Sequence, residues 1–158
     1  MKIRIILITL IALTSTGCVI TSSKPAMTPL EIQALQTREY DSTKDVVFPS
    51  VISVFQDLGY IVETADSTSG LIKAVSATEN SAWLTAFTGA TKNTQTATTA
   101  FIETIGGIVK VRLNFVTKTR SSSAYGAQDQ RDVPILDAQA YQNAFERIEN
   151  AIFVRSAT

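Results

Sequence analysis

A glycine pair in the second half of the chain marks the element that most restricts its fold. Gly106-Gly107 separates two segments, about Thr94 to Thr104 and Ile108 to Lys118, and such a pair favours the tight turn of a β-hairpin. In the second segment apolar residues alternate with polar ones, Val109, Val111, Leu113 and Phe115 against Lys110, Arg112 and Asn114. This alternation indicates a strand with one buried and one solvent-exposed face.

Further strands are predicted nearer the N-terminus. Tyr60 to Thr64 and Leu71 to Ala77 are separated by the sequence Asp-Ser-Thr-Ser-Gly at positions 66–70. Asp and Ser side chains bond to turn backbone and Gly adopts unusual dihedral angles, so these two segments predict a second hairpin. Thr37 to Asp41 is expected to be extended, which brings the sheet to about five strands.

A first amphipathic helix is predicted over about residues 45–58. Asp45 is expected as its N-cap, which would place Pro49 in the first turn, and Gly59 as its left-handed C-cap. The apolar residues at helical spacing are Val47, Val51, Val54, Phe55 and Leu58.

A second amphipathic helix is predicted over about residues 137–154, and a short helix can form at Leu30 to Gln36. Asp137 fits as the N-cap of the long helix, with Leu136 and Tyr141 as a hydrophobic staple. Its apolar stripe consists of Tyr141, Phe145, Ile148 and Ile152.

These elements predict an α+β fold of two layers. The two amphipathic helices, about 45–58 and 137–154, are expected to cover one face of an antiparallel sheet of about five strands. Residues 30–158 would form this single domain. Ser121 to Gln130 is polar, contains Gly126 and is expected to be a mobile loop.

The N-terminal segment predicts export. Lys2 and Arg4 precede an apolar run, Ile5 to Leu13, which is too short to span a bilayer. Small polar residues then lead to Cys18, the only cysteine. The segment resembles the signal peptide of bacterial lipoproteins, cleaved before a cysteine that is lipidated on its sulfur.

That resemblance implies lipid attachment at Cys18 and signal-peptidase recognition of Ser15, Thr16 and Gly17. Ser15 stands where the lipoprotein motif prefers Leu, so a cleaved secreted protein and an uncleaved anchor remain alternatives. In enteric-type lipoproteins an Asp after the cysteine retains the protein at the inner membrane. Val19 is not Asp, so in a host with an outer membrane the periplasmic face of that membrane is the expected location.

The predicted organisation is a signal peptide over residues 1–17 and a flexible tether over 18–29. The tether is rich in Thr, Ser, Lys and Pro, a composition that buries too little apolar surface to fold. Cleavage would leave 141 of the 158 residues, with 12 basic and 14 acidic residues and a net charge of −2. No basic stripe suggests a nucleic-acid partner.

The missing residue types exclude several chemistries. The chain has no histidine, and its one thiol would carry the lipid. Zinc, copper and haem sites built on those ligands are therefore excluded, as are Ser-His-Asp and Cys-His nucleophiles. A carboxylate-only calcium or magnesium site remains formally possible, but no Asp-x-Asp-x-Asp-Gly loop supports it. We expect no metal and no cofactor.

Four short segments resemble a group of small bacterial lipoproteins without a characterised function. They are Gln36-Thr37-Arg38-Glu39-Tyr40, Gln56-Asp57-Leu58-Gly59-Tyr60, Gly70-Leu71-Ile72-Lys73-Ala74 and Tyr141-Gln142-Asn143-Ala144-Phe145. The resemblance covers nearly the whole mature chain and implies fold and location rather than an activity. The order of elements also resembles the helix-grip domains of the outer-membrane assembly lipoprotein BamC.

Ser81 to Ile102 is a candidate interaction surface. Lys92 is its only charged residue, and its large apolar residues include Trp83, Leu84 and Phe87. Contiguous exposed apolar patches tend to mark contacts with proteins or membranes. The alternative is that Trp83 and Phe87, four residues apart, fold a helical turn onto the core while the threonines fill a strand.

Arg38 is a second candidate, because a guanidinium in an extended stretch can clamp an anion with two hydrogen bonds. The structural alternative is an ion pair with a carboxylate such as Glu39 or Asp57, or simple exposure to solvent.

Two pairs of acids could supply the general acid and base of a glycosidase: Glu63 with Asp66, and Asp129 with Asp132. Acids this close in sequence are common on solvated turns. Ser121 to Ser123 has no histidine and no Ser-x-x-Lys arrangement, so a flexible loop is the better interpretation.

These features together predict a membrane-anchored, non-enzymatic lipoprotein that serves as an interaction or assembly module of the cell envelope, with an envelope protein as its partner. The alternative class is a small-ligand or cell-wall-binding domain that uses the sheet surface or Arg38.

Overall fold

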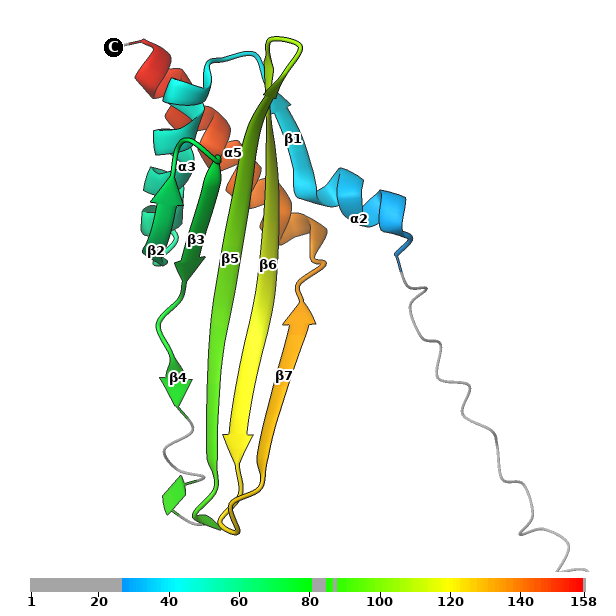
Figure 1. Ribbon diagram of the computed structural model, residues 1–158, viewed down its shortest axis with the longest axis vertical. Helices are drawn as coiled ribbons and strands as arrows, with labels where there is room; N and C mark the ends of the chain where they lie inside the picture. The colour runs from blue at the N-terminus through cyan, green and yellow to red at the C-terminus, as the bar shows by residue number, and fades with distance from the viewer. Residues whose placement is uncertain (1–26, 81–84, 87, 158) are drawn as a thin grey trace, which may run out of the picture.

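A computed structural model describes residues 27–80, 85–86 and 88–157, which form an α+β fold (Figure 1). Three helices pack against an antiparallel sheet with five main strands. The predicted fold class is confirmed, with α2 as a third helix. The elements are α2 (Pro29–Gln36), β1 (Thr37–Tyr40), α3 (Lys44–Asp57), β2 (Ile61–Asp66), β3 (Leu71–Val75), β4 (Glu79–Asn80), β5 (Thr91–Ile105), β6 (Ile108–Ser122), β7 (Gln128–Pro134) and α5 (Ala138–Ser156).

Several predictions lie outside the described residues. These are the signal peptide, lipidation of Cys18, most of the tether, and the surface built on Trp83, Leu84 and Phe87. The last tether residues are described. Thr28 caps α2 and Pro29 is its first residue, so both belong to a helix rather than to a flexible segment.

The sheet has the strand order β1-β6-β5-β3-β2, with β4 beside β5 and β7 beside β6. Both predicted hairpins are confirmed, β2 with β3 and β5 with β6. Gly106 and Gly107 have φ values of 60° and 87°, and two positive φ values in a row match the type I′ turn that suits the twist of paired strands. The two central strands, β5 and β6, are longer than predicted, at 15 residues each.

The predicted mobile loop from Ser121 to Gln130 is wrong at both ends. Strand β6 continues to Ser122 and β7 begins at Gln128, so only residues 123–127 form the turn. All seven residues of β7 are exposed. An exposed edge strand has no buried face and therefore no apolar alternation, and its charges and terminal Pro134 discourage pairing with other chains.

Helix α3 begins two residues earlier than predicted. Its N-cap is Thr43 rather than Asp45, so Pro49 lies inside the helix. The cost of the missing proline N–H is offset because one face of α3 is buried, including Val47, Val51 and Phe55. The predicted role of Gly59 at the C-terminal end is confirmed by its φ of 83°.

The core lies between the helices and one face of the sheet. Both predicted apolar sets are buried there, Val109, Val111, Leu113 and Phe115 from β6 and Tyr141, Phe145, Ile148 and Ile152 from α5. Asp137 is confirmed as the N-cap of α5, because its carboxylate accepts a hydrogen bond from the Gln139 N–H at 2.8 Å.

The three helices cover only one end of the sheet. In Figure 1 the strands β5, β6 and β7 extend well below α3 and α5, with β4 beside them. We call this extension the β-arm. It consists of residues 79–80, 91–97, 116–122 and 128–134, which pair in register across four strands.

Candidate functional site

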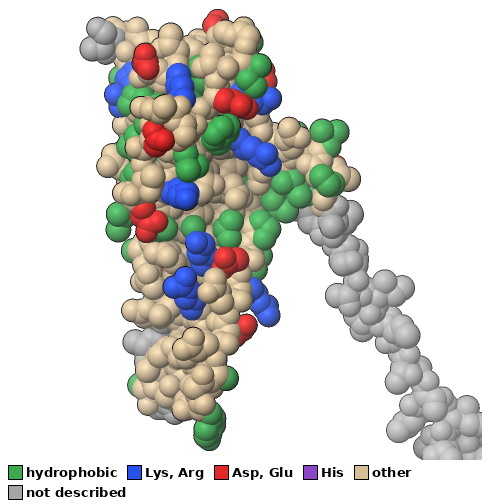
Figure 2. Space-filling model, viewed as in Figure 1, with side chains coloured by type: hydrophobic (Ala, Val, Ile, Leu, Met, Phe, Trp, Pro, Cys, Tyr) green, Lys and Arg blue, Asp and Glu red, His purple; other side chains and the backbone are tan. Residues whose placement is uncertain are grey.

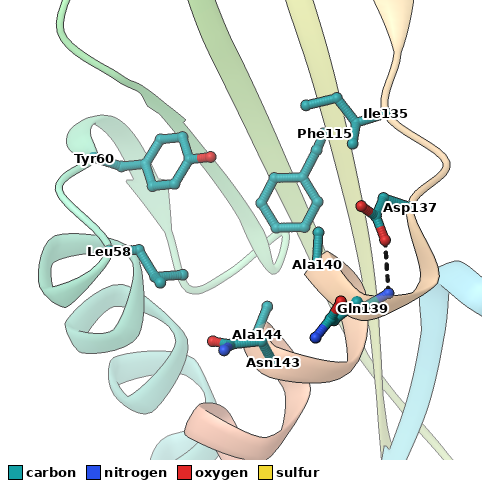
Figure 3. Close-up of a pocket in the computed structure, with 9 residues that line it drawn as sticks. All are labelled: Leu58, Tyr60, Phe115, Ile135, Asp137, Gln139, Ala140, Asn143 and Ala144. Carbon is teal, nitrogen blue, oxygen red and sulfur yellow. Dashed lines mark hydrogen bonds between the residues drawn. The ribbon is translucent and has the colours of Figure 1, made fainter.

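An open groove lies where the helical layer ends over the sheet. Its volume is about 450 Å³. Figure 3 shows side chains from α3, the sheet and α5 converging on it. The lining residues are Leu58, Tyr60, Phe115, Ile135, Asp137, Gln139, Ala140, Asn143 and Ala144.

The end of α3 positions two of these side chains. The Gly59 N–H bonds to the Gln56 carbonyl and the Tyr60 N–H to the Phe55 carbonyl, both at 2.9 Å. This is the Schellman arrangement, which ends a helix at a residue in the left-handed conformation. It reverses the chain immediately after Leu58, so Leu58 and Tyr60 both line the groove.

Aromatic rings form the floor of the groove and continue into the core. The ring of Tyr60 lies 6.3 Å from Phe115 and 6.0 Å from Phe55, and Phe115 lies 5.1 Å from Tyr141, measured between centroids. Burial raises the pKa of the Tyr60 hydroxyl. Figure 3 shows this hydroxyl pointing toward Phe115, across the groove. The floor therefore offers aromatic surface with a neutral phenol at one side.

The first two turns of α5 supply the polar rim. The Asp137 carboxylate is committed to its capping bond with Gln139 N–H, drawn as a dashed line in Figure 3. The side-chain amide of Gln139 has no hydrogen-bond partner among the residues that the structure describes. Asn143 accepts from the Arg147 Nε at 2.8 Å through its oxygen, which leaves its NH₂ group available. The rim therefore has an amide donor and acceptor for a ligand.

Small residues keep the groove open. Ala140 and Ala144 lie four residues apart on the face of α5 that borders it. Longer side chains there would fill the space between α5, Leu58 and Tyr60.

Arg38 does not line this groove. Its guanidinium carbon lies 5.3 Å from the centroid of the Phe145 ring, a cation–π contact with α5. Among the described residues Arg38 has no ion pair with Glu39 or Asp57, and Glu39 pairs instead with Lys110 at 3.7 Å. Arg38 is otherwise exposed to solvent.

All four acids of the two candidate pairs are exposed. Asp129 and Asp132 lie on one strand at an odd spacing, so their side chains project from opposite faces of β7. Asp66 caps the β2–β3 turn, where hydrogen bonds from Ser69 and Thr68 lower the pKa of its carboxyl group. Among the residues that the structure describes, no three His, Cys, Asp or Glu side chains gather as a metal site.

The sequence did not single out the groove. The sequence pattern predicts a strand at Tyr60 and a core position for Phe115, and no pattern points to Gln139. One weak sequence signal marks the place where the groove lies. Phe115 is the last residue of the apolar alternation in β6, and after it Thr117 and Thr119 occupy the same face.

No protein-family model matches the chain, and no curated protein is detectably similar to it. In the described part of the chain no helix is both long and apolar enough to cross a membrane. The described residues thus form an α+β domain with two distinct surfaces. One is the open groove beside the helices, and the other is the β-arm that the helices leave uncovered.

Proposed function

We propose that this chain is a bacterial envelope lipoprotein whose domain binds a partner protein in the groove. The lipid on Cys18 anchors it, at the periplasmic face of the outer membrane. The observation that carries the binding role is an aromatic floor combined with two amides on the rim, the Gln139 amide and the NH₂ group of Asn143, that keep hydrogen-bonding capacity. An apolar side chain can be buried on Tyr60 and Phe115 while Gln139 and Asn143 meet polar groups beside it.

A polypeptide segment supplies both kinds of group together. Burying one large apolar side chain contributes about 1.5–3 kcal/mol, and the peptide groups on either side of it match the donors and acceptors of amide side chains. The groove is open rather than enclosed, so a segment can pass through it without being cut off at its ends. These features favour an anchoring side chain on a partner protein.

A photocrosslinking amino acid at Gln139 should trap that partner in intact cells. The matched control places the same amino acid at Gln142, an exposed residue one turn along α5 that does not line the groove. We expect a protein adduct from position 139 and none from position 142. The measurement is immunoblotting followed by mass spectrometry of the adduct.

A blocking variant completes this test. Ala140→Arg places a long side chain in the groove from an exposed position, so the adduct should disappear while the melting temperature is nearly unchanged. Adducts of equal yield from both positions would contradict a groove-specific partner. An adduct with only the mass of a lipid or a sugar would show that the groove binds a small ligand rather than a protein.

Cys18→Ser should release the protein from the membrane, because serine lacks the thiol that accepts the lipid. Metabolic labelling with an alkyne analogue of palmitate should mark the original chain and not the variant, and fractionation should move the variant out of the outer-membrane fraction. Thr21→Ser is the control and should keep both properties. If Cys18→Ser keeps the label, lipid attachment at Cys18 is refuted, while the proposal that the groove binds a partner protein is not affected.

A further inference from the structure

We propose that the helix-free face of the β-arm binds an acidic glycan, with sugar hydroxyl groups on a row of amide side chains and a carboxylate on Arg120. This surface is separate from the groove. It lies on the opposite face of the sheet and uses none of the groove residues, so a result that contradicts one proposal does not affect the other.

The strand register brings four planar polar side chains into one row. Asn80 of β4 is opposite Asn93 of β5, which is opposite Arg120 of β6, which is opposite Gln130 of β7. Phe115 of β6 faces the helices, so Arg120, five residues later, faces away from them. With about 4.8 Å between neighbouring strands, the row spans about 14 Å, longer than one sugar ring.

The row borders a hollow of about 460 Å³. On the helix-free face it is lined by Thr91, Asn93, Arg120, Ser122, Gln128 and Gln130. The hydroxyls of Thr91 and Ser122 bond to each other at 2.6 Å. Asp129 also borders the hollow, but it is opposite Ser121, and the register places both side chains on the other face.

All four side chains of the row are exposed. None of them has a hydrogen bond or ion pair with any residue that the structure describes. Elsewhere on the same strands an amide does hold the fold together, since the Gln95 Nε2 donates to the Ser76 carbonyl at 3.0 Å. Asparagine is also depleted in strands. The polar groups of the row are therefore available to a ligand.

The chemistry of the row suits a glycan that carries carboxylates. Amide groups both donate and accept hydrogen bonds, as sugar hydroxyls do. A guanidinium pairs with a carboxylate through two parallel hydrogen bonds and is more weakly hydrated than an ammonium group. Lys118 adds positive charge two residues from Arg120 on the same face, with Asp132 opposite it. In Figure 2 the lower, arm-bearing part of the molecule is mostly tan, the colour of the backbone and of side chains that are neither hydrophobic nor charged, with Lys and Arg and some Asp and Glu above it.

The test compares two glycan probes that differ in one group. One is a peptide-free strand of alternating N-acetylglucosamine and N-acetylmuramic acid, whose lactyl groups carry free carboxylates. The other is a chitin oligosaccharide of equal length, which lacks them. Calorimetric titration of the full chain in detergent should show tighter binding of the carboxylated strand, and its affinity should fall as salt rises.

Three variants locate the site. Arg120→Gln should weaken binding of the carboxylated strand at least about tenfold and remove its advantage over chitin. Asn93→Ala should weaken binding of both probes. Arg131→Gln, an exposed arginine that the register places on the opposite face of the arm, should change affinity less than about twofold, since the sheet lies between its side chain and the glycan. The proposal is overturned if the original chain binds neither probe, if it binds both equally, or if Arg131→Gln weakens binding as much as Arg120→Gln.

Discussion

Replacing Gly70 by alanine should destabilise the domain by more than about 3 kcal/mol, because two costs add at this position. Gly70 has a φ of 76°, a conformation that costs other residues about 1–2 kcal/mol. A Cβ built there would collide with the carbonyl oxygen of Ile102, which is backbone of β5 and cannot move aside. The Ile102 N–H also donates to the Gly70 carbonyl at 2.9 Å, so the β2–β3 turn is bonded to β5 at this point.

Urea denaturation followed by circular dichroism measures this change. Gly126→Ala is the matched control, because Gly126 has a similar φ of 84° and nothing within 4 Å of the built Cβ. Only the conformational cost of about 1–2 kcal/mol should appear there. Equal losses in the two variants would show that the contact with Ile102 contributes nothing.

Tyr141→Phe should cost about 1–3 kcal/mol, the penalty for a buried polar group left without a partner. Strand β1 pairs with β6 up to Arg112, and β7 pairs with it from Val116 onward. Between them the Phe115 N–H donates to the Tyr141 hydroxyl at 3.3 Å instead of to a neighbouring strand. The Gln36 amide donates to the same oxygen at 3.4 Å.

Tyr40→Phe is the control for this loss. The Tyr40 hydroxyl donates to the Phe145 carbonyl at 3.3 Å. That carbonyl lies within α5, where the helix itself supplies a donor, so removing the hydroxyl leaves no backbone group without a partner. We expect the Tyr40→Phe loss to be below about 1 kcal/mol. The prediction for Tyr141 is wrong if chemical denaturation gives the two variants the same stability.

The strong periodic signals in the sequence predicted their elements correctly. Apolar residues alternate from Val109 to Phe115 and recur at helical spacing from Tyr141 to Ile152. Each pattern arises because one face of the element is buried, so the pattern predicts that face. The prediction for the start of α3 is wrong, because a proline does not by itself limit where a helix begins. A proline costs one hydrogen bond, and the buried face of α3 outweighs that loss.

Strand β7 was missed for a related reason. A strand that is exposed on both faces and on its outer edge has a polar sequence like that of a loop, and only its ladder with β6 defines it. The same limit applies to Tyr141, whose sequence position indicated the core but not the gap between β1 and β7 that its hydroxyl fills.

The sequence by itself determined the two hairpins, the two long helices, the buried face of the sheet and therefore the α+β class. Only the tertiary structure decided where the helices stop over the sheet, and with that the groove at Tyr60 and Phe115 and the uncovered β-arm with Arg120. The physical reason is that periodicity specifies which face of an element is buried. How far one layer extends over another depends on contacts between residues distant in the chain.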